Sequence, residues 1–332
     1  MIDDEDMSSF FTGKTVLITG ATGSIGSEIV RQILKQDPKA VRLYSRDEHK
    51  QFLMEKELAG NKKVRYFIGD VRDLSRLNSA MEDVDYVFHT AAYKHVPLCE
   101  YNSFEAVKTN VMGTQNVIEA ALQNNVERVL LISTDKAASP SNVMGATKLL
   151  AEKLMTSAMH SKGTRSILFS SVRFGNVIGS RGSVIPTFIS QIQKGEPLTI
   201  TDPEMLRFFM SIPQAVQLTM DAMQQMTGGE VFILKMPLMK LGDLADVLIE
   251  KYGDGSVKKE IIGARAGEKM TEELMTESEA AYAEEKDNMF VVHALHNLPG
   301  EDFLVFSPKQ DVKGWNSSSS IPLSKEEIAK MV

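Results

Sequence analysis

The first half of the chain alternates short, nearly continuous apolar runs with longer segments whose apolar residues recur at helical spacing. Such runs are typical of strands that are buried on both faces of a parallel sheet. We predict strands at residues 15–19, 40–44, 64–69, 86–90, 128–133 and 166–173. We predict helices at residues 24–36, 48–58, 74–81, 104–124 and 143–161. This alternation indicates an α/β fold with a doubly wound parallel sheet.

The pattern changes after about residue 175. Further helices are predicted at residues 184–194, 213–226, 241–252 and 271–285, with a short strand at 198–201. The last of these helices carries a Glu-rich run, interpreted as a solvated helix face. Ser324-Lys-Glu-Glu327 has the capping-box pattern of a final short helix. We predict a Rossmann-type domain at 11–175, with later returns of the chain left open, and a smaller C-terminal substrate-binding lobe and tail at 176–332.

Composition is that of a soluble globular protein, with 43% hydrophobic and 24% charged residues among 332. The net charge of −7 argues against a nucleic-acid binder but leaves room for a local basic phosphate pocket. One cysteine, Cys99, excludes an internal disulfide and a multi-cysteine metal cluster. The 19 methionines are interpreted as core filling. The acidic N-terminus and short apolar runs predict a cytoplasmic protein with no membrane segment. No metal site is predicted.

A glycine-rich turn, Gly20-Ala-Thr-Gly23-Ser-Ile-Gly26, joins the first predicted strand to the first predicted helix. Glycines permit the tight turn and let backbone N–H groups approach a pyrophosphate at the positive end of the helix. This strand–turn–helix context favours dinucleotide binding over a purely structural turn. The turn residues expected to bind the cofactor are Gly20, Thr22, Gly23, Ser24, Ile25 and Gly26.

The end of the next predicted strand indicates which dinucleotide binds. A carboxylate directly at this strand end would bind the ribose hydroxyls of NAD and repel a 2′-phosphate. Ser45 and Arg46 instead offer a hydroxyl and a guanidinium that suit a phosphate, so we predict NADP. Asp47 and Lys50 complete this part of the predicted cofactor site. A surface ion pair between Arg46 and Asp47 is the alternative interpretation.

Two later segments are expected to line the cofactor and the substrate. His89-Thr-Ala-Ala-Tyr-Lys-His95 follows a strand, and its small residues Ala91 and Ala92 permit a close approach to a ligand. Lys94 would reach a phosphate or remain a surface lysine, and Asn110 would have a functional or a structural role. Thr134-Asp-Lys136 ends another strand, at the edge where parallel sheets bind ligands. It supplies a general acid and base or, alternatively, a solvated ion pair.

The chain from about Phe11 to the tail resembles the extended short-chain dehydrogenase/reductases, specifically the 4,6-dehydratases that act on UDP-N-acetylglucosamine. The resemblance rests on the glycine turn and on Ser45-Arg-Asp-Glu48, Gly69-Asp-Val-Arg-Asp73, Lys94-His-Val-Pro97, Ser133-Thr-Asp-Lys-Ala137, Arg173-Phe-Gly-Asn-Val177, Thr201-Asp-Pro203 with Arg207-Phe208, and Gly263-Ala-Arg-Ala-Gly-Glu-Lys269. This chain is similar to the soluble members rather than to those with an added transmembrane part. Family members form dimers and hexamers, so the resemblance implies a homo-oligomer.

The resemblance also implies roles for individual residues. Asp70 and Val71 would embrace the adenine of the cofactor. The remaining cofactor residues would be Ala91, Lys94, Lys148 and Asn176. The UDP-sugar would be bound by Lys94, by Asn176 at the sugar or diphosphate, by Arg207 and Arg265 at the pyrophosphate, and by Glu268 at the uridine ribose.

By resemblance, hydride passes from C4 of the sugar to NADP+, and Lys136 then removes the C5 proton while Asp135 protonates the departing 6-hydroxyl. Hydride return to C6 would give a UDP-4-keto-6-deoxy-HexNAc, with Thr134 orienting the 4-oxygen. Release of the 4-keto-5,6-ene for a partner reductase, and C5 epimerisation, stay open. A downstream reductase or aminotransferase that acts on the product is a candidate partner.

One position departs from the superfamily's Tyr-x-x-x-Lys pattern. Lys148 is present, but Met144 stands where the tyrosine is expected, as in some dehydratases. A thioether cannot accept the 4-hydroxyl proton, which would fall to Asp135, Lys148 or a water. Two other functions remain: a nucleotide-sugar 4-epimerase, which Asp135 and Lys136 disfavour, and a non-catalytic NADP-sensing protein, which Met144 favours.

Overall fold

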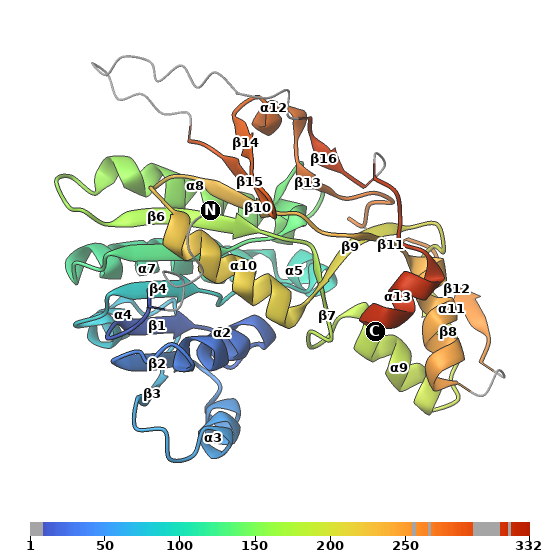
Figure 1. Cartoon of the computed structure of the whole chain (residues 1–332), viewed down its shortest axis with the longest axis horizontal. Coiled ribbons are helices and arrows are strands. Elements are labelled where there is room, and N and C mark those ends of the chain that lie inside the picture. The colour runs from blue at the N-terminus through green and yellow to red at the C-terminus, as the bar shows by residue number, and fades with distance from the viewer. Residues whose placement is uncertain (1–8, 254–256, 265–266, 295–312, 318–319) are drawn as a thin grey trace.

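The computed structural model describes residues 9–253, 257–264, 267–294, 313–317 and 320–332. Within them, the strands of the main sheet are β1 (Thr15–Thr19), β2 (Ala40–Ser45), β3 (Val64–Ile68), β4 (Tyr86–His89), β5 (Arg128–Ile132), β6 (Leu168–Arg173), β10 (Val231–Leu234), β14 (Ala283–Glu285) and β15 (Met289–Val292). Their order is β14-β15-β10-β6-β5-β4-β1-β2-β3 (Figure 1). The strands from β3 to β10 are parallel, and β15 and β14 are antiparallel. The predicted doubly wound α/β fold is confirmed.

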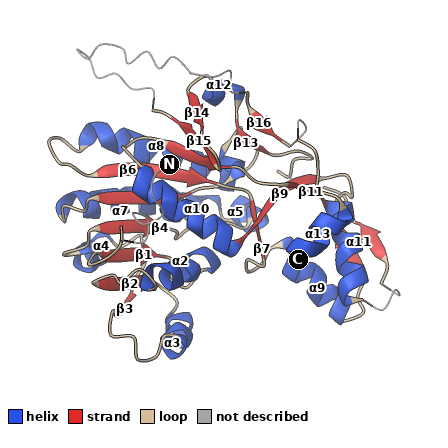
Figure 2. Cartoon of the chain, in the orientation of Figure 1, coloured by secondary structure: helices blue, strands red, loops and turns tan. Residues whose placement is uncertain are grey.

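Helices cover both faces of this sheet (Figure 2). The helices of this part of the chain are α2 (Ser24–Leu34), α3 (Glu48–Glu57), α4 (Leu74–Met81), α5 (Val96–Tyr101), α6 (Ser103–Ala106), α7 (Gly113–Gln123), α8 (Val143–Ser161) and α10 (Ile212–Gln225). Helices α2 and α10 pack together on one face, where Ile33 and Met220 share a core. Helices α4, α7 and α8 bury Leu77 and Met155 in a second core. Because both faces are covered, β1 is buried along its whole length, which explains its continuous apolar sequence.

The segment predicted as one helix at 104–124 is helical throughout but not uniform. A π-helix, η1 (Val107–Met112), lies between α6 and α7. Such short π-helical segments are frequent at functional sites. Here the irregular turn contains Asn110 and precedes Gly113, which packs closely against Val71.

A smaller lobe lies at the right of Figure 1. It contains α9 (Val184–Gln193), α11 (Leu241–Tyr252), α13 (Lys325–Met331), and the strands β7 (Asn176–Ile178), β8 (Leu198–Ile200), β9 (Leu206–Ser211), β11 (Leu238–Lys240) and β12 (Lys259–Ile261). Phe188, Leu248 and Ile328 belong to its own core. The chain returns from this lobe to the main sheet as α10 and β10, and again as β14 and β15. The predicted capping box of Ser324 and Glu327 begins α13.

The predicted helix at 271–285 is wrong. This segment forms β13 (Glu273–Met275), α12 (Glu277–Ala280) and β14, and β13 pairs with β16 (Trp315–Asn316). Its Glu-rich run is not simply a solvated face, because Glu279 binds the buried side chain of Arg173. The strand partners of β13 and β14 are supplied by later residues, which a local periodicity does not reveal.

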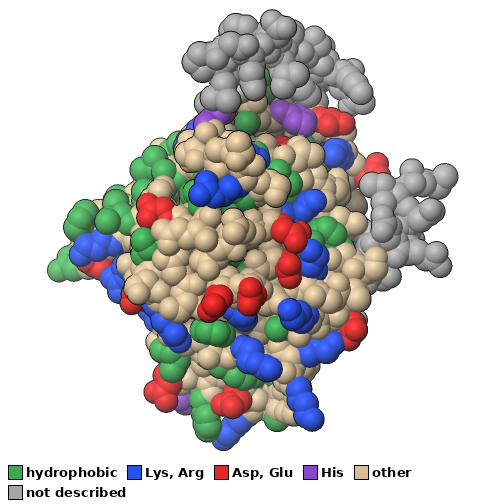
Figure 3. All heavy atoms as spheres, turned by 90° about the vertical axis from the view of Figure 1, so that its left-hand side faces the viewer, with side chains coloured by type: hydrophobic (Ala, Val, Ile, Leu, Met, Phe, Trp, Pro, Cys, Tyr) green, Lys and Arg blue, Asp and Glu red, His purple; other side chains and the backbone are tan. Residues whose placement is uncertain are grey.

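In the part of the chain that the structure describes, no helix combines the length and apolarity needed to span a membrane. Figure 3 shows the face at the left of Figure 1, where acidic and basic side chains are interspersed. The net negative charge is therefore not gathered into one patch on that face. Groups that could bind a phosphate lie instead at the carboxyl edge of the parallel strands.

Candidate active site

The glycine-rich turn between β1 and α2 is built for close backbone approach. Gly20 has a φ of +66°, and a Cβ at this position would lie 2.8 Å from the backbone nitrogen of Ala91. A Cβ on Gly26 would lie 2.5 Å from the carbonyl oxygen of Gly20. Among the described residues, no side chain caps the first turn of α2. Its N-terminus therefore suits an anion such as a pyrophosphate.

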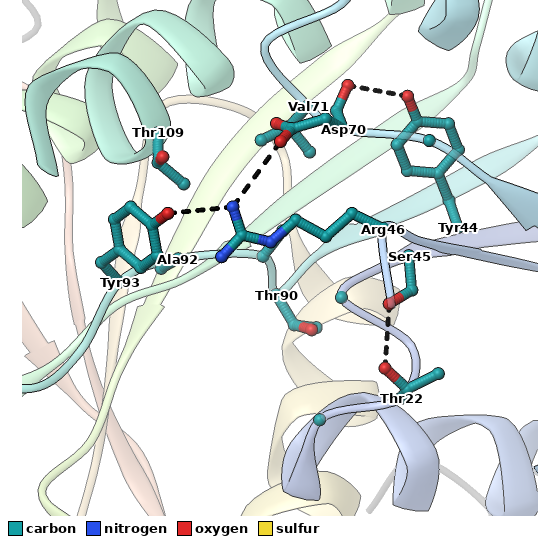
Figure 4. Close-up of a pocket in the computed structure, with 14 residues that line it drawn as sticks. Thr22, Tyr44, Ser45, Arg46, Asp70, Val71, Thr90, Ala92, Tyr93 and Thr109 are labelled. Atoms are coloured by element: carbon teal, nitrogen blue, oxygen red, sulfur yellow. Dashed lines mark hydrogen bonds and ion pairs between the residues drawn. The ribbon is translucent and has the colours of Figure 1, made fainter. Parts of the chain in front are cut away.

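A pocket opens beside this turn (Figure 4). It is lined by Gly20, Thr22, Gly23, Tyr44, Ser45, Arg46, Gly69, Asp70, Val71, Thr90, Ala91, Ala92, Tyr93 and Thr109. The hydroxyl oxygen of Thr109 is buried there and has no hydrogen-bond partner within the described residues. The glycine cradle and this polar atom fit a dinucleotide. The structure thus brings together predicted residues from the ends of β1, β2, β3 and β4.

Ser45 and Arg46 lie in this pocket at the end of β2. The Ser45 hydroxyl is 2.9 Å from the hydroxyl of Thr22. The Arg46 guanidinium donates to the Tyr93 hydroxyl at 2.9 Å and lies 3.6 Å from Asp70 (Figure 4). The alternative pair of Arg46 with Asp47 is not what the structure shows. Half of the Arg46 side chain is exposed, so its cation is accessible to a ligand.

Other predicted cofactor residues lie outside the lining of this pocket. Asp47 caps α3 by accepting from the Lys50 backbone, and the two side chains form an ion pair of 2.7 Å. Ser24, Ile25 and Gly26 lie in the first turn of α2. Their contacts with a cofactor, and those of Lys94, Lys148 and Asn176, remain predictions.

A loop of the smaller lobe reaches over the glycine turn. The backbone of Arg181 donates to the Ser24 hydroxyl at 3.0 Å, and its guanidinium donates to the Thr22 carbonyl. Lys94 donates to the Arg181 carbonyl at 2.9 Å. Burial, together with the nearby Arg181 cation, lowers the pKa of Lys94. In the sequence, the position of Arg181 carries only a turn signal, so its place beside the cofactor pocket was not predicted.

His89 and Asn110 hold the scaffold of the site. The His89 ring lies between the hydroxyls of Thr19, at 2.7 Å, and Thr114, at 3.1 Å. Burial lowers the pKa of His89 to about 3, so the ring is uncharged at neutral pH. Asn110 accepts from the backbone N–H of Tyr93 and donates to its carbonyl. Of the two roles considered for Asn110, the structure shows the structural one.

The predicted acid–base segment follows β5, where Thr134 precedes the short 3₁₀ turn η2 (Asp135–Ala137). One carboxylate oxygen of Asp135 accepts from the Thr134 hydroxyl at 2.8 Å and from the Lys136 ammonium at 2.9 Å. The other oxygen is buried without a partner in the described residues. Asp135 is fully buried and the Lys136 side chain is 20% exposed. This pair is therefore not the solvated ion pair considered as the alternative.

A second carboxylate faces the same lysine. Glu272 Oε1 lies 3.6 Å from the Lys136 ammonium and 3.9 Å from Nε of Arg207. Burial lowers the pKa of Lys136, but Asp135 and Glu272 outweigh burial, so the net pKa is raised. Burial raises the pKa of Glu272. Sequence reasoning missed Glu272, because nothing in its local pattern connects it with Lys136.

Lys148 and Met144 occupy successive turns of α8. The Lys148 ammonium donates to the carbonyl of Ile132, at the end of β5, at 2.6 Å. Burial lowers the pKa of Lys148 to about 8. Met144 is buried in a small apolar cluster with Cys99 and Ala106. The tyrosine position is thus filled by a packing residue that cannot transfer a proton.

The predicted substrate residues lie in or near the smaller lobe. Asn176 begins β7, next to Gly175, at which a Cβ would lie 3.2 Å from Asp135 Oδ2. Arg207 donates to the carbonyls of Leu206 and Lys269 at 2.8 Å each. Glu268 lies in the same loop as Lys269, whereas Arg265 lies outside the described residues. Contacts of these groups with a nucleotide sugar remain predictions.

Comparison with known proteins places the chain in a family. The family described as "polysaccharide biosynthesis protein" matches residues 16–294. A Methanocaldococcus jannaschii protein named only as an uncharacterized membrane protein is 51% identical over 99% of this chain and 98% of its own length. A UDP-N-acetylglucosamine 4,6-dehydratase (inverting) of Campylobacter jejuni is 45% identical over 85% and 83%. A UDP-glucose 4-epimerase of Rickettsia canadensis is 43% identical over 83% and 81%.

Solved structures agree with this placement. The structure of Pen from Bacillus thuringiensis superposes with a TM-score of 0.90 at 48% identity, covering 97% of this chain and 98% of that one. A dTDP-glucose 4,6-dehydratase of Streptomyces venezuelae gives a TM-score of 0.71 at 22% identity, covering 77% and 86%, and supports the fold alone. The chain belongs to the polysaccharide biosynthesis protein family and is an extended short-chain dehydrogenase/reductase of the nucleotide-sugar 4,6-dehydratase type.

Proposed function

We propose that this protein dehydrates UDP-N-acetylglucosamine across C5 and C6, with NADP as its cofactor, to a UDP-4-keto-6-deoxy-HexNAc. The observation that carries the proposal is the ion pair of fully buried Asp135 and partly buried Lys136 at the carboxyl edge of the sheet. Elimination of water needs a general base at C5 together with a general acid at the 6-hydroxyl, whereas a 4-epimerase eliminates no water and needs no such pair. The dehydratase name of the Campylobacter relative supports the substrate.

The chain's own residues account for the proton transfers. A nicotinamide cofactor held by the glycine turn and the pocket lining would supply the hydride acceptor and donor for the sugar. Once C4 is a ketone, the C5 proton is acidic, and uncharged Lys136 removes it. Asp135 donates its proton to the departing 6-hydroxyl, and Thr134 orients the 4-oxygen. The separation of 2.9 Å between Lys136 Nζ and Asp135 Oδ1 lets one proton pass between these residues before catalysis.

The 4-hydroxyl proton needs a different acceptor, because Met144 has none to offer. Lys148 has a pKa of about 8, so a substantial part of it is uncharged slightly above neutral pH. This supports Lys148 among the three acceptors, with Asp135 and a water as the others. Its bond to the Ile132 carbonyl holds it at the end of the strand that leads to Thr134.

Product identification tests the proposal. After incubation with UDP-N-acetylglucosamine and NADP+, we expect a product lighter by one water, with a methyl doublet at C6 in its proton NMR spectrum. A product with vinyl protons in place of the methyl group would show that the 5,6-ene is released. Unchanged substrate with the cofactor bound, or its C4 epimer without loss of water, would contradict the dehydratase proposal.

The preference for NADP depends on Arg46. Arg46→Ala should raise the dissociation constant of NADPH about 10- to 100-fold, because a charge-assisted hydrogen bond to a phosphate contributes about 1.5–3 kcal/mol. The dissociation constant of NADH should stay nearly unchanged, since NADH has no 2′-phosphate. Titration by quenching of protein fluorescence measures both constants. Lys56→Ala, an exposed change on α3, is the control. An equal rise in the dissociation constants of NADPH and NADH would show that Arg46 supports the structure of the pocket and does not bind the 2′-phosphate.

A further inference from the structure

The ammonium of Lys136 lies between two carboxylates from distant parts of the chain. Asp135 is its neighbour in sequence, whereas Glu272 directly precedes β13. The Glu272 side chain is only 4% exposed. A buried carboxylate is costly to desolvate unless cations compensate for the lost water. The cations that face it are Lys136 and Arg207, with Lys269 in the adjoining loop.

Glu272 is held in this position from both sides of its backbone. Its N–H donates to the Ser317 hydroxyl at 2.9 Å, and the Ser317 N–H donates to the Glu272 carbonyl at 2.9 Å. Ser317 is fully buried and follows β16, which pairs with β13. These two hydrogen bonds with Ser317, near the C-terminus, therefore hold the Glu272 backbone beside Lys136.

Resting on the proposed dehydration, we propose that Glu272 is a positioning residue that stabilises the ammonium formed on Lys136 when the C5 proton is removed. Before this step Asp135 carries the proton destined for the leaving hydroxyl and is uncharged. Glu272 is then the nearest carboxylate to Lys136 within the described residues. It stabilises a positive charge that grows in the transition state, which is the kind of interaction that raises the rate.

The proton transfers balance through the whole elimination. The C5–H proton passes to Lys136 Nζ, and the C5–H electron pair forms the C5–C6 double bond as the C6–O bond breaks. The departing hydroxyl takes the Asp135 proton and leaves as water, so Asp135 becomes a carboxylate. Transfer of one proton from Lys136 Nζ to Asp135 Oδ1 over 2.9 Å restores the starting state. Glu272 itself exchanges no proton in this scheme.

The substitution Glu272→Gln tests this role, because it keeps the size of the side chain and removes its charge. We expect kcat to fall about 10- to 100-fold, a part of the 10²–10⁴-fold that a general base contributes. A deuterium at C5 of the substrate should give a larger isotope effect than in the unmodified protein, because C5 proton removal becomes slower. NADPH affinity should not change, since Glu272 does not line the cofactor pocket.

The pH profile separates this role from a purely structural one. Asp135, Lys136, Glu272, Arg207 and Lys269 are the charged groups that interact here. Loss of the Glu272 charge favours deprotonation of the Asp135–Lys136 pair, so the bell-shaped kcat profile should move to lower pH. Glu272→Asp keeps the charge and should recover part of both the rate and the profile.

Glu273→Gln is the matched control, because adjacent residues of an extended segment point to opposite sides. It should leave kcat, the isotope effect and the pH profile unchanged. The proposal is overturned if Glu272→Gln keeps the original values, or if its rate falls with no change in isotope effect and profile. If the unmodified protein itself releases no water from UDP-N-acetylglucosamine, the proposed function fails first, independently of Glu272.

Discussion

Lys136→Ala is expected to lower the rate of water loss from UDP-N-acetylglucosamine by about 10²–10⁴-fold, the usual contribution of a general base. Lys136 is the proposed base, and its side-chain nitrogen lies 2.9 Å from Asp135 Oδ1. Without Lys136 the elimination loses the group that removes the C5 proton and the partner that exchanges a proton with Asp135. Measurement of kcat by NMR or by coupled chromatography of the UDP-sugars gives the loss directly.

Two controls show whether this loss is chemical. NADPH should bind with unchanged affinity, because Lys136 does not line the cofactor pocket. Lys153→Ala, an exposed change on the same protein, should leave the rate as it is. Asp135→Asn keeps the shape of the acid but cannot donate its proton, so it should cause a loss of similar size. A Lys136→Ala protein that still eliminates water within tenfold of the original rate would refute the assignment of the base.

Arg173→Met is expected to lower the free energy of unfolding by about 3–5 kcal/mol, as when one partner of a buried ion pair is removed. Arg173 is fully buried and binds Glu152 of α8 at 2.6 Å and Glu279 of α12 at 2.9 Å. It also donates to the Leu274 carbonyl at 2.9 Å. Methionine would fill much of the space but leave both carboxylates without their cation. Urea unfolding at neutral pH measures the effect.

The pH dependence of this stability has a defined sign. Burial raises the pKa of Glu279, but Arg173 and Thr276 outweigh burial and lower it below its ordinary value of 4.5. The stabilisation from Glu279 is therefore complete above that value and is lost as the pH falls through the lower pKa of the folded state. In Arg173→Met the free energy of unfolding should therefore fall less steeply as the pH is lowered. Arg165→Met, at an exposed position, should change stability by no more than about 0.5 kcal/mol. Equal effects of the two substitutions would contradict the prediction.

The first half of the fold was predictable because its signals are local. The predicted strand at residues 15–19 and the predicted helices at 74–81 and 143–161 coincide with β1, α4 and α8. In each of these elements the apolar residues face the neighbouring layers of the fold, so the local sequence pattern matches the burial. The helix predicted at 271–285 failed for the opposite reason. Its residues pair with β15 and β16 and bind Arg173, and all three partners lie outside the predicted helix.

The candidate site likewise has a part that the sequence predicts and a part that only the tertiary structure shows. Three parts of the site could be predicted from the sequence, because each is a short motif at the end of a strand. They are the glycine turn, Ser45 with Arg46, and the Thr134–Lys136 segment. The sequence alone also determined that Met144 replaces the expected tyrosine. Only the tertiary structure decided that Met144 packs with Cys99, that Arg181 lies over the glycine turn, and that Glu272 faces Lys136. These contacts join residues that lie 45, 157 and 136 positions apart, and folding alone sets the distances between such segments.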